Sequence, residues 1–118
     1  MLARAFYVLF SMGTLQRVLR TMMETRGNLS EAEAARLLFT SRRSFRRVFP
    51  QVFGTSFRKK RLEIKLDRAQ ELLDTTDWPI PMIAENLGYS ERSKLDKPFA
   101  ESRGMTPAQY RARRRSNM

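Results

Sequence analysis

Apolar residues recur along most of the chain at intervals of three and four, the spacing of one face of an α-helix. The first such stripe consists of Leu15, Val18, Leu19, Met22 and Met23. It stops at Gly27 and Asn28, two residue types that readily take the left-handed conformation at a helix end. The pattern predicts an amphipathic helix, with Met22 and Met23 filling the core.

Two shorter segments follow, and a serine begins each of them. Ser30 precedes Glu33 by three residues, which is the capping-box pattern, and small or apolar residues come next. The pattern breaks at Phe39 and Thr40, after which Ser41 is suited to cap another helix. That helix has its apolar positions at Phe45, Val48, Phe49 and Val52. A short helix, a tight turn and a second capped helix predict a helix-turn-helix unit.

The remainder of the chain repeats this arrangement after a long helix. Ser56 opens the long helix, which residues 75–79 break. A short helix from Ile80 to about Gly88 and a helix that Ser90 would cap come next. The apolar and glycine positions of the two halves match at offsets of 49 or 50 residues, as Phe45, Phe49 and Gly54 do with Leu95, Phe99 and Gly104. We therefore predict an all-α fold of two homeodomain-like three-helix subdomains joined by a long linking helix.

The predicted helices set the boundaries of the parts of the chain. Residues 1–14 are expected to form an amino-terminal helical extension with an apolar stripe at Leu2, Phe6, Leu9 and Phe10. The first unit covers about 15–55, the linking helix about 56–75 and the second unit about 78–111. Residues 112–118 are expected to be a basic, disordered and solvated tail.

The charge of the chain indicates what kind of partner it binds. The 118 residues carry 23 Lys and Arg against 12 Asp and Glu, a net charge of +11. Such a surface attracts polyanions, and nucleic acid is the commonest of them. Eight of the basic residues lie between Ser41 and Arg61, where there is no acid. Solvated helix faces normally intersperse the two signs, so this run favours contact with DNA.

Residues that the chain lacks exclude other classes of function. Without Cys or His it has no disulfide, no thiolate nucleophile and none of the commonest bases and transition-metal ligands. We expect no enzyme activity, no cofactor and no metal. No apolar run approaches the roughly 20 residues of a membrane span, and the lack of cysteine suits a cytoplasmic protein.

The second half resembles the DNA-binding domain of the AraC/XylS family of bacterial transcription regulators. The residues that match the family signature are Ile83, Ala84, Leu87, Gly88, Tyr89, Ser90, Ser93, Leu95, Lys97, Phe99, Gly104, Thr106, Pro107, Tyr110 and Arg111. The first half is similar through Ser41, Arg42, Arg43, Phe45, Arg47, Phe49, Gly54 and Ser56. The resemblance covers Leu15 to Arg111. The sequence differs from the family pattern at Phe57, where the family usually has proline, and at Lys60, where an aromatic residue is common.

The resemblance implies a seven-helix domain that lays two recognition helices into successive segments of the major groove. Most members of the family carry an effector or dimerisation domain ahead of this one, and only residues 1–14 precede the first helix here. The chain is thus either a stand-alone regulator or the carboxyl-terminal fragment of a larger one. It is expected to bind double-stranded DNA as a monomer rather than an obligate dimer, with RNA polymerase as a second candidate partner.

The first recognition helix carries the main candidate site. With Phe45, Val48 and Phe49 toward the core, Arg43, Arg46 and Arg47 face outward, where arginine can bond guanine bidentately. These three match family positions that contact bases, and Arg42 is assigned to phosphate. The helix starts at Ser41 and Ser90 are further candidates, because amides at a helix amino end favour anions.

The second recognition helix is the weaker candidate. Arg92, Ser93 and Lys97 match family positions that approach DNA, but four acids balance the four basic residues between Met82 and Arg103. Asp96 would repel phosphate or accept a hydrogen bond from cytosine. Pro50 and Pro98 fall inside the two recognition helices, where each removes a backbone hydrogen bond. The first unit is therefore expected to dominate affinity.

Three functions remain open at this stage. The first is a sequence-specific transcription activator or repressor. The second is a charge-driven binder of nucleic acid or anionic membrane that reads no bases. The third is an interaction module that has lost DNA binding, for which the apolar stripe at residues 2–10 is the only indication.

Overall fold

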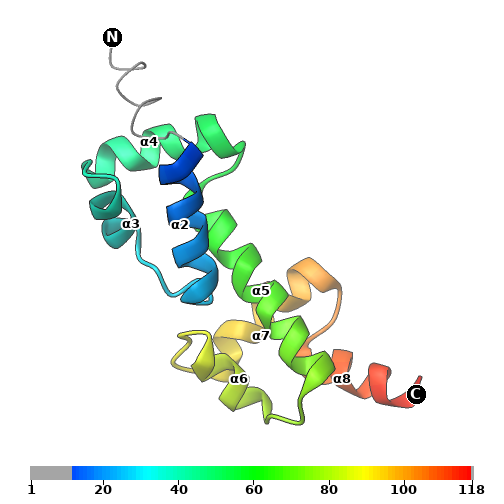
Figure 1. Ribbon diagram of the computed structural model, residues 1–118. Coiled ribbons are helices and arrows are strands. Elements are labelled where there is room, and N and C mark those ends of the chain that lie inside the picture. The colour runs from blue at the N-terminus through cyan, green and yellow to red at the C-terminus, as the bar shows by residue number, and fades with distance from the viewer. Residues whose placement is uncertain (1–11, 118) are drawn as a thin grey trace. The chain divides into compact units, whose positions relative to one another are not determined.

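The computed structural model describes residues 12–117, and the side chains from residue 17 onward. The secondary structure of this part of the chain consists of helices joined by turns and short loops, without strands, as predicted (Figure 1). The helices are α2 (Met12–Glu24), α3 (Glu31–Leu37), α4 (Arg42–Phe53), α5 (Phe57–Thr75), α6 (Ile80–Asn86), α7 (Arg92–Arg103) and α8 (Pro107–Ser116). Most of the predicted amino-terminal extension, including its apolar stripe, lies outside the described residues.

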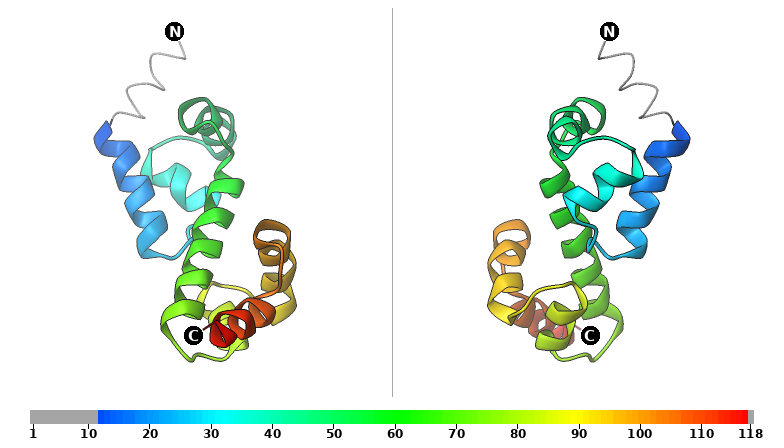
Figure 2. Two further views of the ribbon diagram at one scale, coloured as in Figure 1. Left: turned by 90° about the vertical axis from the view of Figure 1, so that its right-hand side faces the viewer. Right: turned by 90° about the vertical axis from the view of Figure 1, so that its left-hand side faces the viewer.

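The chain divides into two compact units between Ile64 and Lys65, so that helix α5 begins in the first and ends in the second. The first unit contains α2, α3 and α4 with the start of α5. In the second, α6, α7 and α8 gather around the carboxyl-terminal half of α5 (Figure 2). Each unit thus has a short helix, a turn and a 12-residue helix in succession, the two predicted helix-turn-helix units.

The first unit is built on a cluster of aromatic rings. Phe45 and Phe49 are fully buried on α4, and Phe57 meets both rings edge-on from the start of α5, at centroid distances of 5.2 and 5.5 Å. Phe57 therefore contributes to this core in place of the family's proline. Val18 and Met22 of α2 complete it, whereas Met23 is 68% exposed, so its assignment to the core was wrong.

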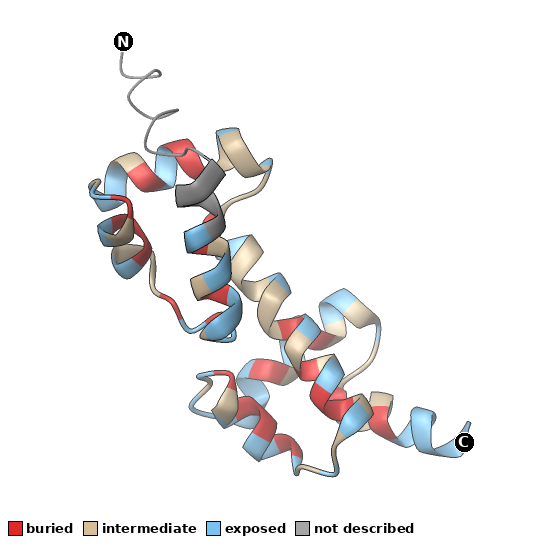
Figure 3. Ribbon diagram, in the orientation of Figure 1, coloured by how far each residue is buried: buried red, intermediate tan, exposed pale blue. Residues whose placement is uncertain are grey.

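The second unit buries the corresponding apolar positions of its own helices. Leu66, Ala69, Leu72 and Leu73 of α5 are buried, together with residues of α6 and α7 such as Ile83, Leu95 and Phe99 (Figure 3). Phe99 also meets the ring of Tyr110 edge-on at 5.8 Å, which ties α7 to α8. The apolar spacing along the chain predicted these core positions.

Side-chain caps begin three of the helices as predicted. Ser30 and Glu33 form the capping box of α3, and Ser41 Oγ accepts the Ser44 amide hydrogen at 3.1 Å. Ser56 Oγ likewise accepts from Lys59 at 3.1 Å. Ser90 does not cap α7. The N-cap of α7 is Glu91, whose side chain makes no capping bond. The segment between α6 and α7 is one residue longer than the segment between α3 and α4, which places Ser90 one residue ahead of the cap.

The turns of the two units have the same backbone conformation but different residues. Gly88 takes a φ of +85° after α6, and the equivalent residue after α3, 49 positions earlier, is Phe39 with a φ of +54°. A side chain in this left-handed region is strained, whereas glycine is not. The Phe39 ring is also 88% exposed, so packing does not compensate for the strain.

The structure also corrects the prediction of a disordered tail at residues 112–118. Helix α8 continues to Ser116, so the expected disordered tail is helical over most of its length. Arg111 in this helix is buried, and its guanidinium donates hydrogen bonds to the backbone carbonyl oxygens of Trp78 and Thr76. Both prolines lie inside their helices, and α4 and α7 extend three and five residues past Pro50 and Pro98.

Candidate nucleic-acid interface

Helix α4 presents a row of exposed basic side chains on the side away from its buried phenylalanines. The exposed members of this basic face are Arg42, Arg43, Arg46 and Arg47. The local sequence produces this arrangement because Ser41 fixes the first turn, while Phe45, Val48 and Phe49 hold one face in the core. The exposure of Arg43, Arg46 and Arg47 agrees with the helical spacing.

The four arginines surround a shallow hollow of about 390 Å³. Among the described side chains, these four arginines line it, so a ligand that enters it meets guanidinium groups on several sides. Guanidinium groups bind phosphate and the O6 and N7 atoms of guanine through paired hydrogen bonds. The chemistry of this hollow therefore suits a nucleic acid, whose backbone is anionic and whose base edges carry acceptors.

One acid approaches this face from the preceding helix. Glu31 in the first turn of α3 places Oε1 2.6 Å from Arg46 Nη2 and 3.0 Å from Arg46 Nε. The same oxygen lies 3.5 Å from Arg42 Nε. The hydrogen bond to Arg46 lowers the pKa of Glu31 and raises the pKa of Arg46, so both groups stay charged. Sequence reasoning missed Glu31, because nothing in its spacing relates it to Arg46.

The equivalent face of α7 holds fewer available donors. Arg92, Ser93 and Lys97 are all exposed, as expected. However, Arg92 Nε lies 3.6 Å from Asp96 Oδ2, and the Ser93 hydroxyl donates to Glu91 Oε2 at 3.1 Å. Ser90 is exposed before the helix, where Glu91 adds a negative charge beside the first amides. The exposed face of α7 thus carries both positive and negative charges.

Several other basic residues belong to the fold. Arg61 at the start of α5 lies over the Phe57 ring and donates to the Leu29 carbonyl at 3.5 Å. Arg103 at the end of α7 pairs with Asp67 of α5 at 2.6 Å. These contacts use charges that the sequence alone would count toward DNA binding. Arg58 and Lys59 remain exposed beside the first turn of α5.

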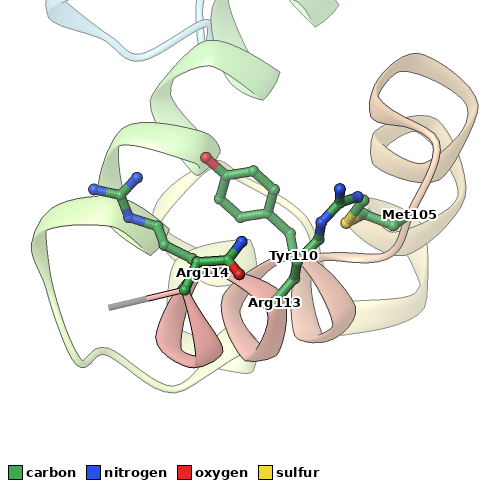
Figure 4. Close-up of a pocket in the computed structure, with 5 residues that line it drawn as sticks. Met105, Tyr110, Arg113 and Arg114 are labelled. Atoms are coloured by element: carbon green, nitrogen blue, oxygen red, sulfur yellow. The ribbon is translucent and has the colours of Figure 1, made fainter.

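The basic residues of α8 surround a second hollow, of about 360 Å³. Figure 4 shows the Tyr110 ring between Arg114 on one side and Met105 with Arg113 on the other. Tyr110 donates to Asp74 Oδ1 at 2.8 Å, and Arg114 Nε lies 3.1 Å from the same oxygen. Burial and the bond to Asp74 raise the pKa of Tyr110. These groups hold α8 against α5 rather than forming a site for an anion.

Among residues 12–117, no group of three or more acids is placed to hold a metal ion. No helix in this stretch is long and apolar enough to cross a bilayer.

Paired helix-turn-helix units with a basic recognition helix define a class of DNA-binding proteins. A family model described as a helix-turn-helix domain matches residues 34–113, and the chain belongs to this family, the AraC-type DNA-binding transcription regulators. The resemblance seen in the sequence is confirmed.

Particular relatives support this membership. The chain is 32% identical over 100 residues, 84% of its length, to the RCS-specific HTH-type transcriptional activator RclR of Escherichia coli. It is 34% identical over the same share to the ornithine utilization regulator of Pseudomonas aeruginosa. The chain covers only 35% and 29% of these two proteins.

A solved structure gives the same result. The DNA-binding domain of AdpA, in complex with a target DNA, matches with a TM-score of 0.81 and 27% identity. The match covers 87% of this chain and 94% of that domain. An AraC-type regulator from Chromobacterium violaceum matches with a TM-score of 0.76 and 30% identity, over 86% of this chain and 92% of that one.

Proposed function

We propose that the chain binds double-stranded DNA sequence-specifically by placing helix α4 in the major groove. The observation that carries this proposal is the row of exposed arginines on α4, opposite a fully buried aromatic face. A recognition helix needs both features, because the core fixes its orientation while the other face meets the base edges. The AdpA domain, which is similar in fold, was solved on its target DNA.

The residues of α4 divide into two roles in this proposal. Arg43, Arg46 and Arg47 read bases, with guanine as the preferred partner of each. Arg42 neutralises phosphate, and the backbone amides beside Ser41 bond another phosphate at the helix amino end. Phosphate contacts set the position of the protein on the duplex, and the base contacts supply the sequence preference.

Helix α7 contributes less in our proposal. A second segment of the groove is approached by Arg92, Ser93 and Lys97. Of these, Arg92 pairs with Asp96 and Ser93 donates to Glu91. The first unit therefore supplies most of the affinity. We further propose that the protein acts as a monomer in the cytoplasm, with RNA polymerase as a second partner, and that it regulates transcription by activation or repression.

Selection of binding sites from a randomised duplex pool tests the main proposal. We expect one enriched motif, or two half-sites about one helical turn apart if both units dock. Arg47→Ala should weaken binding to the selected duplex by about 1–3 kcal/mol and relax the preference at one base pair. Arg20→Ala, an exposed arginine of α2, is the control with the same loss of charge. Equal retention of every duplex would remove the sequence-specific proposal.

The mixed charge of α7 favours a second candidate, a charge-driven binder of nucleic acid or anionic membrane. Such a protein would lose affinity steeply with salt, and it would bind all duplexes of one length equally. Titrations of the selected and a scrambled duplex at several salt concentrations separate the two candidates. A preference that persists at every salt concentration contradicts the second one.

A further inference from the structure

Glu31 contacts one particular edge of the Arg46 guanidinium. A guanidinium has a side edge, formed by Nε and one terminal nitrogen, and an end edge, formed by both terminal nitrogens. Glu31 Oε1 accepts from Nε at 3.0 Å and from Nη2 at 2.6 Å, which occupies the side edge. The end edge keeps one hydrogen on Nη2 and one on Nη1, so a pair of parallel donors remains.

The remaining edge can still bond guanine, and the contact with Glu31 limits how far the Arg46 side chain turns toward a phosphate. Guanine O6 and N7 need two parallel donors, which the end edge supplies while the contact with Glu31 persists. A single arginine without such a partner has many rotamers and can turn toward whichever phosphate is near. The acid thus restricts Arg46, and any rotation away from it gives up a short charged hydrogen bond.

The negative charge of Glu31 also disfavours contact with phosphate. Its carboxylate lies beside α4, which carries four arginines and no acid, and Arg42 Nε is also 3.5 Å from Oε1. It reduces the local positive charge that attracts any phosphate backbone, whatever its sequence. Of the three side chains, that of Glu31 is the least exposed, at 21%, whereas those of Arg42 and Arg46 are 61% and 65% exposed.

The second unit lacks this arrangement. The residue equivalent to Glu31 is Ile80, which is buried, and the residue equivalent to Arg46 is Asp96. The acid therefore lies on the recognition helix itself in the second unit, paired with Arg92. The contact between α3 and α4 is a feature of the first unit among the described residues.

We infer that Glu31 is a specificity-determining positioning residue, which holds Arg46 for base reading and weakens binding to DNA of other sequences. This inference rests on the proposed function and names how the same site discriminates. Glu31 touches no base itself. Its removal should change the ratio of affinities for selected and unselected DNA more than the affinity for selected DNA.

The test compares Glu31→Gln with Glu33→Gln. Both substitutions remove one negative charge from the first turn of α3, but Glu33 contacts the Ser30 amide at 3.4 Å, a capping bond that glutamine preserves. Dissociation constants are measured for the selected duplex and a scrambled duplex at one salt concentration. Thermal unfolding of each variant checks that the helices remain intact.

We expect Glu31→Gln to lower the ratio of the two affinities about tenfold, the value of one good base contact. The lost preference should fall on the base pair that Arg46→Ala also relaxes. Glu33→Gln should leave the ratio within about twofold, because Glu33 bonds the Ser30 amide and it is Glu31 that bonds Arg46. In an Arg46→Ala background, Glu31→Gln should no longer change the ratio.

Two results overturn the inference and differ from each other. If the unchanged protein prefers its selected duplex and Glu31→Gln keeps the full ratio, or acts as Glu33→Gln does, only the inference is wrong. If the unchanged protein retains every duplex equally, the proposed function fails and the inference fails with it.

Discussion

At the scale of single residues, the turn after α3 departs from the turn after α6 in its chemistry but not its backbone. Phe39 takes a φ of +54° where the second unit has Gly88. The ring is 88% exposed and gains little from packing. The residue is therefore a local cost in stability that the fold tolerates.

Replacing this residue should stabilise the first unit. Phe39→Gly removes the left-handed strain and is expected to raise the free energy of unfolding by about 1 kcal/mol, measured by urea denaturation. Phe39→Ala is the matched control, since it removes the same ring but keeps a Cβ atom in the left-handed region. Equal stability changes in both variants would attribute the effect to loss of the exposed ring instead.

Glu31 gives a prediction with a defined direction in pH. The hydrogen bond from Arg46 lowers its folded pKa below the ordinary value of 4.5. The pair therefore stabilises the folded state fully above pH 4.5, and this contribution is lost as the pH falls through the lowered pKa. The difference in unfolding free energy between the unchanged protein and Glu31→Gln should shrink from pH 7 to pH 3. A difference that is constant over this range would contradict the pairing.

At the scale of elements, the helix that opens after each recognition helix carries an arginine at the same place. Arg61 of α5 reaches the Leu29 carbonyl, and Arg111 of α8 reaches the Trp78 carbonyl, at offsets of 50 and 49 residues. The internal repeat therefore extends to polar contacts. Arg111 is the more buried of the two, and this burial lowers its pKa.

Loss of Arg111 should destabilise the second unit. Arg111→Leu keeps apolar bulk but leaves the carbonyls of Thr76 and Trp78 without their charged donor, which should cost about 1.5–3 kcal/mol of unfolding free energy. Arg113→Leu is the control, because Arg113 is exposed on the same helix. Denaturant midpoints of both variants measure the effect. Equal midpoints would mean that water replaces the lost bonds.

At the scale of the whole molecule, the two helix-turn-helix units share a backbone plan but carry different surfaces. The α4 face is basic and has its acid on the neighbouring helix. The α7 face has its acid at Asp96, within the recognition helix. A repeat of this kind lets one unit change its surface while the core positions of both are kept.

Asp96→Asn tests whether α7 touches DNA. The substitution removes a negative charge from the α7 face and releases Arg92, so binding to the selected duplex should tighten severalfold if α7 docks. Glu24→Gln, an exposed acid at the end of α2, is the control for net charge. An unchanged dissociation constant for Asp96→Asn would mean that α4 alone engages the duplex.

The sequence by itself determined the helices, most of their caps and the core of each unit. These features are local: the spacing of Phe45, Val48 and Phe49 sets a buried face, and a serine three residues before Glu33 sets a helix start. The basic face of α4 follows from the same periodicity, since residues between the buried positions must point outward. The missed cap at Ser90 shows the limit, because a shift of one residue changes which side chain meets the first amides.

Only the tertiary structure decided which charges meet. Glu31 and Arg46 are 15 residues apart on different helices, and their contact depends on how α3 packs on α4. The exposure of Met23 and the burial of Arg111 likewise depend on which neighbours cover one side of a helix. Helical periodicity gives the direction of a side chain from its own axis, but the packing of helices against one another determines what that side chain touches.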